Sequence, residues 1–275
     1  MASLKGVYAE GVRAIVADLA GTTVDYGSCA PAGVFVQVFR NAGVELSLAE
    51  ARGPMGMGKK DHIRELFRLP RVTEAWRAAK GRDWSEADVI VLYEAFIPLQ
   101  LNCLADYNNL IPGVYQTVSE LQQDGIQLGV NTGYTREMTQ IVLDGMRQQG
   151  VVPRAVSCLS DVPAGRPAPW MIFDTMEQLG VFPPAAVIVI GDTLSDIEAG
   201  RNAGAWTVGV TRTGNLVGMT STEIHLAEPS LVAAKVAEAE AIMRAMGADY
   251  VVDSFADLPQ LIDKINLRLG AGERP

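Results

Sequence analysis

The sequence predicts an α/β protein whose core is a parallel β-sheet. Four short runs rich in Val and Ile end at small or polar residues, at 14–18, 127–132, 187–192 and 207–210. They are continuously apolar, as strands are when both faces of a parallel sheet are buried. Helical patterns lie between the runs, and this alternation is typical of a Rossmann-like sheet. A long helical stretch after the first run predicts, in addition, an inserted all-helical cap domain.

The helices of the core are predicted from apolar residues that recur every three or four positions. Three such stripes are Val114, Val118 and Leu121; Ile172, Met176 and Leu179; and Leu258, Leu261, Ile262, Ile265 and Leu269. The last stripe is the clearest, because Ser254 and Asp257 precede it at the spacing of a capping box.

Residues 28–105 interrupt the alternation, because they contain helical stripes and no run typical of a buried strand. Two of the four tryptophans, Trp76 and Trp84, lie in this block. We therefore expect a discontinuous core domain formed by residues 1–27 and 106–275, and a cap domain formed by residues 28–105. Gly27 on one side and Pro112-Gly113 on the other are suitable hinges.

The composition argues against several classes of protein. Of the 275 residues, 48% are hydrophobic, which disfavours a disordered chain. The net charge of −9, from 23 basic and 32 acidic residues, provides no general attraction to nucleic acid or to an anionic membrane. Three scattered cysteines suit neither a disulfide framework nor a zinc site, so we expect a cytoplasmic protein. We expect no targeting segment and no membrane-spanning helix.

Polar side chains are found at the ends of three predicted strands. These are Asp18, Thr132 and Asp192, with Asp196 four residues beyond Asp192. A single acid at such a position is most simply a helix N-cap. Four polar residues together indicate a site, because ligands of parallel sheets bind beyond the carboxyl ends of the strands. Two carboxylates at i and i+4 suit a hard cation such as Mg²⁺.

These residues resemble the motifs of the haloacid dehalogenase superfamily. Asp18-Leu19-Ala20-Gly21-Thr22 resembles the first motif, Thr132 the second, Arg166 the third, and Gly191-Asp192 with Asp196 the fourth. The resemblance implies that Asp18 is a nucleophile and that Mg²⁺ is bound by Asp18, the Ala20 carbonyl and Asp192. It also implies that Thr132 and Arg166 contact the substrate. We expect Asp196 to orient the metal site from behind its ligands.

One position departs from the phosphatases of that superfamily. They carry a second Asp two residues after the nucleophile, which protonates a departing alkoxide, and this position is Ala20 here. Loss of a general acid costs roughly 10²–10⁴-fold in rate. The chain is therefore either a damaged phosphatase or an enzyme whose leaving group needs no acid.

A second resemblance favours an enzyme whose leaving group needs no acid. The segment Met55-Gly56-Met57-Gly58-Lys59-Lys60-Asp61-His62 resembles the phosphonoacetaldehyde hydrolase (phosphonatase) family, and so do residues 18–26, 132–138 and 161–167. The resemblance implies that Lys59 forms a Schiff base with an aldehyde. It further implies substrate-binding roles for Thr132, Gly133, Arg166, Met55 and Gly56, and a homodimer formed through the cap. We expect His62 to relay protons during imine formation.

The chemistry that the two resemblances imply is consistent. A carbanion is a poor leaving group, but an iminium on Lys59 is an electron sink from which carbon departs as a neutral enamine. Asp18 attacks phosphorus in this scheme and becomes an aspartyl phosphate, which water hydrolyses. The expected reaction is the cleavage of phosphonoacetaldehyde to acetaldehyde and phosphate, in the degradation of 2-aminoethylphosphonate.

Three alternatives stay open on the sequence alone. The first is a Mg²⁺-dependent phosphate-ester hydrolase or phosphomutase, which Ala20 disfavours. The second is a 2-haloacid dehalogenase, which needs no metal and is disfavoured by the pair Asp192 and Asp196. The third is a binding protein that has a hydrolase fold but no enzymatic activity. It is disfavoured because the expected nucleophile, lysine and arginine are all present.

Overall fold

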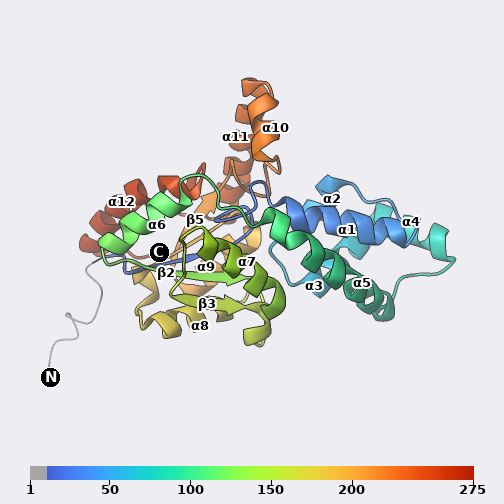
Figure 1. Ribbon diagram of the computed structural model, residues 1–275, viewed down its shortest axis with the longest axis horizontal. Helices are drawn as coiled ribbons and strands as arrows, with labels where there is room; N and C mark the ends of the chain where they lie inside the picture. Colours follow the sequence, from blue (N-terminus) through green and yellow to red (C-terminus); the bar gives the residue numbers. More distant parts are fainter. Residues whose placement is uncertain (1–10) are drawn as a thin grey trace.

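A six-stranded parallel sheet forms the centre of the computed structural model, which describes residues 11–275 (Figure 1). The strands are β1 (Ala14–Ala17), β2 (Gln127–Thr132), β3 (Ala155–Cys158), β4 (Val187–Gly191), β5 (Trp206–Val210) and β6 (Tyr250–Val252), in the order β3-β2-β1-β4-β5-β6. The predicted fold class is confirmed, and the four apolar runs match four of these strands to within one residue. The first ten residues of the expected core domain lie outside the described residues.

The two strands at the edges of the sheet were not predicted from the sequence. β3 has four residues, Ala155-Val156-Ser157-Cys158, and β6 has three, all half-buried. An edge strand pairs on one side only and needs no long apolar run. Neither segment therefore carries the continuous apolar pattern from which the central strands were predicted.

Helices cover both faces of the sheet. On one face, α8 (Trp170–Leu179) and α9 (Leu194–Ala203) share an apolar cluster with Ala14 and Val16 of β1. On the other face, α6 (Val114–Gln123), α7 (Arg136–Gln148) and α12 (Leu258–Gly270) share a cluster with Ile15 and Ala17. Alternate residues of β1 thus enter opposite cores, which explains why this run is apolar throughout.

The last helix, α12, follows the prediction with one difference in its start. Its five predicted stripe residues are all buried. The capping box of Ser254 and Asp257 is present, but it caps a short 3-10 turn, Phe255–Asp257, and α12 begins directly after that turn.

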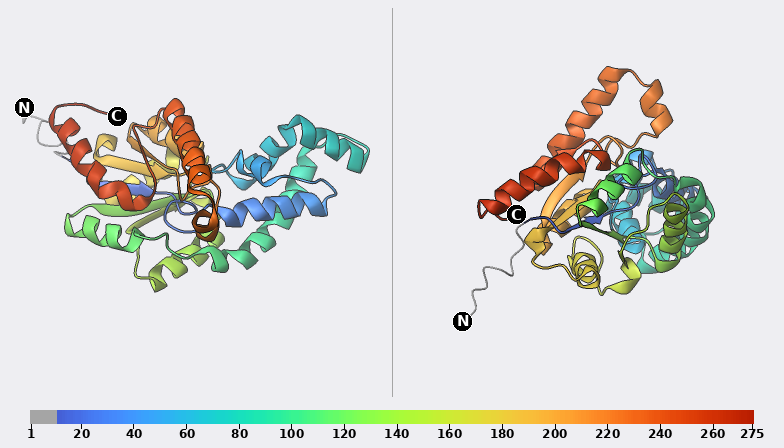
Figure 2. Two further views of the ribbon diagram at one scale, coloured as in Figure 1. Left: turned by 90° about the horizontal axis from the view of Figure 1, so that it is seen from above. Right: turned by 60° about the vertical axis from the view of Figure 1, so that its left-hand side comes forward.

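Five helices form a group of their own beside the carboxyl ends of the strands, referred to below as the cap (Figures 1 and 2). They are α1 (Cys29–Asn41), α2 (Leu48–Arg52), α3 (Lys59–Arg68), α4 (Pro70–Lys80) and α5 (Glu86–Leu104), and no strand occurs between residues 29 and 104. Aromatic rings fill the interior of the cap. Phe67 stacks on Trp84 with ring centres 5.0 Å apart and meets the edge of Trp76 at 4.8 Å.

The longest helix of the cap departs from one sequence-based expectation. Residues 86–107, which comprise α5 and the turn after it, have the length and composition of a membrane-spanning helix. Asp88 and Glu94 interrupt its apolar run, so it does not contain the roughly 20 consecutive apolar residues by which a membrane helix was sought in the sequence. In the fold α5 packs against α1, α3 and α7, with Val89, Leu92 and Phe96 buried. One side of α5 therefore packs inside the cap, while Ile90 and Val91 on its other side are exposed.

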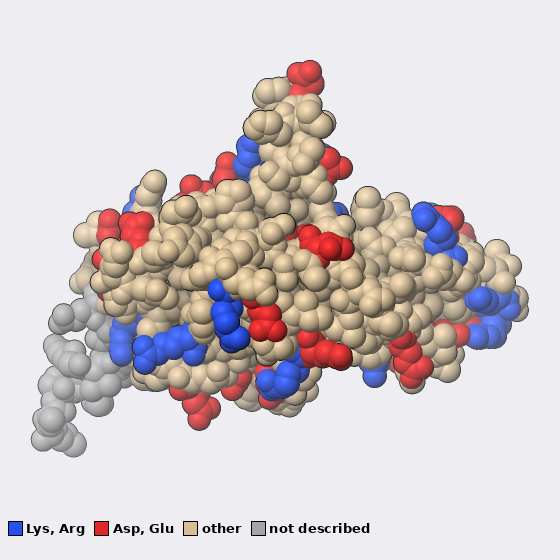
Figure 3. Space-filling model, in the orientation of Figure 1, with Lys and Arg blue, Asp and Glu red and all other residues tan. Residues whose placement is uncertain are grey.

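The helices α10 (Ser221–Leu226) and α11 (Pro229–Met246) project from the sheet (Figure 1). In the space-filling view, acidic and basic side chains are interspersed over the visible face, and that face carries no continuous basic surface (Figure 3).

Candidate active site

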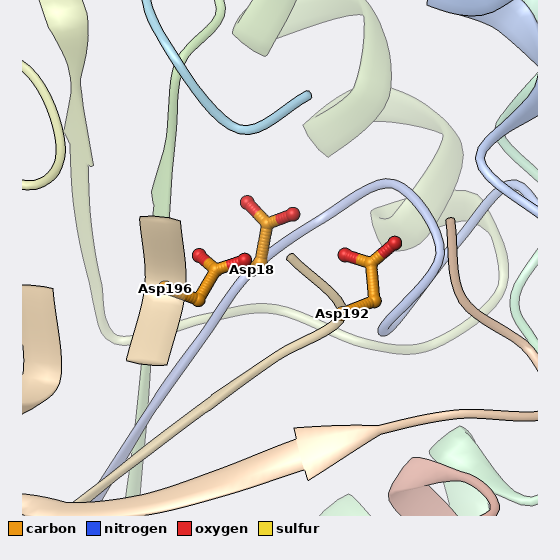
Figure 4. A group of neighbouring side chains, drawn as sticks. All are labelled: Asp18, Asp192 and Asp196. Atoms are coloured by element: carbon orange, nitrogen blue, oxygen red, sulfur yellow. The ribbon is translucent and has the colours of Figure 1, made fainter. Parts of the chain in front are cut away.

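Three aspartates meet at the carboxyl ends of β1 and β4. Asp18 directly follows β1, Asp192 directly follows β4, and Asp196 lies in the first turn of α9. The two strands are neighbours, and the Asp18 N–H donates to the Ile190 carbonyl at 2.9 Å. Carboxylate oxygens of the three aspartates lie within 4.8 Å of one another, and the side chains extend to the same side of the strand ends (Figure 4).

The electrostatics of this cluster favour a bound cation. Burial, together with the charges of Asp18 and Asp196, raises the pKa of Asp192 well above its ordinary value. Burial also raises the pKa of Asp196 to about 6, an effect that Arg166 opposes and Asp18 reinforces. A divalent ion among these oxygens would offset the repulsion between the carboxylates, which adds to the effect of burial. Carboxylate oxygens are the donors that Mg²⁺ prefers, so this donor set fits that ion.

Arg166 binds two of the three aspartates. Its Nη2 donates to Asp18 Oδ1 at 2.7 Å, and its Nη1 lies 2.6 Å from Asp196 Oδ1. Nη2 also donates to the Asn131 carbonyl at 2.9 Å and to the side-chain oxygen of the same residue. Burial opposes the charge of the guanidinium, but the neighbouring carboxylates prevail and raise the pKa of Arg166. Arg166 is therefore a permanent cation beside Asp18, suited to an anionic group.

Lys59 brings an amine to the same place from the cap. It is the first residue of α3, and only 4% of it is exposed. Its Nζ lies 5.0 Å from the centre of the Tyr134 ring, 5.7 Å from that of Phe35 and 5.8 Å from that of Phe96. Burial lowers the pKa of Lys59 to about 8, although the charge of Asp18 partly offsets the effect. A substantial fraction of this amine is therefore neutral, and nucleophilic, near pH 8.

The neighbouring Lys60 points elsewhere. It is exposed, and its Nζ lies 4.8 Å from the centre of the Tyr93 ring. Adjacent residues of a helix project in different directions, which separates these two lysines. Of the two lysines, Lys59 alone lines the cavity described below.

His62 lies one turn after Lys59 and is fully buried. Its ring stacks on Phe35 with centres 3.8 Å apart, and its Nε2 lies 2.8 Å from the Ala51 carbonyl. A carbonyl only accepts, so Nε2 carries the proton and Nδ1, which has no hydrogen-bond partner, is free to accept one. Burial, and then the charge of Lys59, lower the pKa of His62 well below its ordinary value. The imidazole is therefore neutral.

A small cavity joins the core to the cap. It is lined by Asp18, Ala20, Thr132, Gly133, Tyr134, Arg166 and Thr193 from the core, and by Ser28, Pro31, Met55, Gly56, Met57 and Lys59 from the linker and the cap. About 20 Å³ is free, which is room for roughly one water molecule. A molecule larger than water therefore fits here only if the walls of the cavity move apart.

Two glycines allow the loop before Lys59 to reach the core. Gly56 has a φ of +90°, and a Cβ there would lie 2.2 Å from the Thr193 hydroxyl oxygen. A Cβ on Gly133 would lie 3.1 Å from the Met57 carbonyl oxygen. A side chain at either position would crowd the facing segment, so glycine permits the two backbones to approach this closely.

All the residues expected to bind substrate, namely Thr132, Gly133, Arg166, Met55 and Gly56, line this cavity, whereas Asp192, Asp196 and His62 stand behind its walls. Two wall residues, Tyr134 and Thr193, were not predicted from the sequence as parts of the site. Ser28, which also lines the cavity, had no predicted role. Tyr134 lies in the segment 132–138 that carried the resemblance, so a signal for it existed. Asn131, which binds Arg166, gave no such signal.

Comparison with known proteins then identifies the family. A family model described as haloacid dehalogenase-like hydrolase matches residues 12–204. A phosphonoacetaldehyde hydrolase from Paraburkholderia phytofirmans is 43% identical over 264 residues, which cover 96% of this chain and 99% of the relative. This chain belongs to the phosphonoacetaldehyde hydrolase family. It is thus an enzyme of the hydrolase class.

Two further members of the family support the assignment over nearly the whole chain. The crystal structure of a phosphonoacetaldehyde hydrolase-like protein from Oleispira antarctica matches with a TM-score of 0.94 and 38% identity, covering 96% of each chain. A bifunctional phosphonoacetaldehyde hydrolase/aminoethylphosphonate transaminase from Clostridioides difficile is 38% identical over 95% of this chain, a match that spans 41% of that longer protein. The region of this chain that these relatives match therefore includes both the sheet and the helical cap.

Proposed function

We propose that this chain hydrolyses the carbon–phosphorus bond of phosphonoacetaldehyde to acetaldehyde and phosphate. The observation that carries the proposal is the meeting of Lys59 and Asp18 at one small cavity, with Ala20 at the position of a general acid. An amine and a carboxylate facing one small molecule suit a substrate with an aldehyde at one end and phosphorus at the other. The bifunctional relative from C. difficile supports a supply of this aldehyde by transamination of 2-aminoethylphosphonate.

Lys59 supplies the amine in this reaction. Its pKa of about 8 leaves much of it neutral near that pH, as attack on a carbonyl requires. The amine adds to the aldehyde carbon, and loss of one water gives an iminium. His62 is the proposed relay for the protons exchanged here, because it lies one turn from Lys59 and its Nδ1 has no hydrogen-bond partner.

Asp18 supplies the nucleophile for phosphorus. One carboxylate oxygen bonds to phosphorus as the carbon–phosphorus bond breaks, and the electron pair of that bond passes into the iminium to give an enamine. The enamine takes up a proton on carbon, and water hydrolyses the resulting imine to acetaldehyde and free Lys59. A second water hydrolyses the aspartyl phosphate and restores Asp18. No alkoxide forms at any stage, so no acid is needed at Ala20.

The phosphonate is held, in this proposal, by Arg166 and Thr132, with Gly133 beside them. Met55 and Gly56 enclose the aldehyde end from the cap. Because the guanidinium of Arg166 is buried, its attraction to an anion is screened little by solvent.

Magnesium is the proposed cofactor, with Asp18, Asp192 and the Ala20 carbonyl as its ligands. Mg²⁺ supplies charge neutralisation, which weakens the repulsion between the Asp18 carboxylate and the phosphonate oxygens. Asp196 orients the site from behind, because its Oδ2 accepts the Thr193 N–H at 3.0 Å while its Oδ1 faces Arg166.

A homodimer formed through the cap, located in the cytoplasm, completes the proposal. The exposed side of α5 carries apolar side chains, among them Ile90, 46% exposed, and Val91, 61% exposed. The three cysteines are free, which suits a reducing compartment. Sedimentation tests the dimer: the unmodified chain should sediment as a dimer and Val91→Glu as a monomer, whereas a monomeric unmodified chain contradicts it.

Product release from three substrates tests the function. The purified chain is incubated with phosphonoacetaldehyde, p-nitrophenyl phosphate or 2-chloropropionate, each with and without Mg²⁺. Rapid release of phosphate is expected from phosphonoacetaldehyde with Mg²⁺. A preference for p-nitrophenyl phosphate would favour a phosphate-ester hydrolase, and metal-independent release of chloride a dehalogenase.

A further inference from the structure

Asn215 contacts the proposed metal site and the cap at the same time. It lies buried in the loop after β5, and its backbone N–H donates to Asp192 Oδ2 at 2.7 Å. Its side-chain Oδ1 accepts from Arg52 Nη1 at 3.1 Å, and its Nδ2 donates to the Arg52 carbonyl at 3.1 Å. The backbone of one residue thus binds the carboxylate that follows β4, while its side chain makes a two-point bond with the last residue of α2.

Arg52 joins further parts of the molecule around this bond. Its Nη1 donates to the Gly27 carbonyl at 2.7 Å, in the linker that enters the cap, and its Nη2 donates to the Gly218 carbonyl at 3.1 Å, in the core. Gly218 has a φ of +63°, and a Cβ there would lie 2.7 Å from Arg52 Nε. The core loop is therefore shaped to admit this guanidinium. Because Arg52 belongs to the cap, its bonds to Asn215 and Gly218 form only when the cap lies against the core.

Arg52 also begins the loop that leads to Lys59. This loop, residues 53–58, touches the core just beyond Asp192: Met55 accepts a hydrogen bond from the Ser195 hydroxyl at 3.4 Å, and Gly56 packs against Thr193. The N-terminal end of the loop is thus held by Asn215, and its middle by the residues after β4. Placement of Lys59 in the cavity depends on both contacts.

We infer that Asn215 is a positioning residue that couples the seating of Asp192 to closure of the lysine-bearing loop. When a cation orients Asp192, the backbone of Asn215 is fixed, and its side chain stays turned toward Arg52. A cation at the aspartates therefore favours the closed loop, and by linkage the closed loop favours the cation. The role in catalysis and the cation at the aspartates rest on the proposed function, but the bonds of Asn215 to Asp192 and Arg52 do not.

Hydrogen exchange read by mass spectrometry tests the coupling without substrate. Amide exchange in residues 53–62 is compared with and without Mg²⁺ in the unmodified chain and in Asn215→Ala, which removes both side-chain bonds and keeps the N–H to Asp192. Mg²⁺ should slow exchange of this segment several-fold in the unmodified chain and not in the variant. Asn202→Ala is the matched control, because the Asn202 amide donates to the Pro167 carbonyl at 2.9 Å on the exposed side of α9. It should keep the full effect of Mg²⁺.

Two results would overturn the inference: Mg²⁺-dependent slowing that survives in Asn215→Ala, or none in the unmodified chain. If Asn215→Ala does not fold, as circular dichroism would show, Arg52→Gln disrupts the same pair from the cap side and should also abolish the slowing. A double variant should show no further loss, because the two residues form one link. Phosphate release by the unmodified chain is measured separately, so failure of the proposed function and failure of the coupling are distinguishable.

Discussion

Arg166 Nη2 lies 2.7 Å from Asp18 Oδ1, although 148 residues separate the two in the chain. The pair is buried, and the same guanidinium bonds to Asp196. One oxygen of the Asp18 carboxylate is therefore bound to Arg166, and this bond fixes the direction in which the other oxygen points. Breaking one partner of a buried ion pair leaves the other charge uncompensated, so the arrangement has direct consequences for substitutions.

Asp18→Asn should abolish turnover while preserving the fold. The amide has nearly the shape of the carboxylate, but it cannot form an aspartyl phosphate. Phosphate release from phosphonoacetaldehyde should fall at least about 10³-fold, as for loss of a nucleophile in other enzymes. Circular dichroism and a thermal melt establish folding. A folded variant that kept more than about one per cent of the activity would contradict the role of Asp18.

The clustering of Asp18 and Asp192 was predictable because it follows from topology. Both residues directly follow strands that read as buried, and the carboxyl ends of neighbouring parallel strands lie at the same edge of a sheet. Asn131 and Asn215 were not predictable in this way. Each acts through a contact to a residue brought near only by the fold, Arg166 in one case and Arg52 in the other. Their own sequence neighbourhoods contain no sign of that contact.

Removal of metal should abolish turnover, and addition of Mg²⁺ should restore it. Three buried carboxylates lie together beside one guanidinium, and without a cation their negative charges repel the phosphonate that Asp18 must attack. Asp192→Asn should raise the Mg²⁺ concentration for half-maximal activity by roughly tenfold or more, in line with loss of one ligand charge. Asp174→Asn, on α8, is the matched control and should behave as the unmodified chain. Normal turnover by chelator-treated protein would instead favour the dehalogenase chemistry.

Ala20→Asp should not improve cleavage of phosphonoacetaldehyde. Ala20 lines the cavity, so an Asp there would be close to the reacting groups. The proposed leaving carbon departs as an enamine and needs no proton at that moment, whereas an ester oxygen does. The variant should therefore gain activity on p-nitrophenyl phosphate and lose some on the aldehyde, by the release of phosphate from each. Faster carbon–phosphorus cleavage would show that position 20 has another role.

The pH dependence should reflect the buried amine. Lys59 is reactive when neutral, so the rate of borohydride-trapped imine formation should rise with pH and level off above about 8. The same shift affects stability: from about pH 8 to 10.5 the unfolded chain binds more protons at this residue than the folded chain, so the free energy of unfolding should rise with pH there. Lys59→Met should remove that rise in denaturant titrations. A trapping rate that keeps climbing to pH 10 would contradict the desolvated amine.

Lys59 and Lys60 provide the sharpest test of the function, because adjacent lysines of one helix differ in burial. Lys59 is 4% exposed and lines the cavity, while Lys60 faces solvent over Tyr93. Borohydride added with phosphonoacetaldehyde should inactivate the enzyme and leave a reduced adduct on Lys59, located by peptide mass spectrometry. Lys59→Arg should be inactive although it keeps the charge, because a guanidinium stays protonated and does not attack a carbonyl. Lys60→Arg should keep nearly full activity in the same assay. An adduct on Lys60, or no adduct on any lysine of an enzyme that still releases phosphate, would exclude the imine, and with it the explanation of why position 20 is Ala.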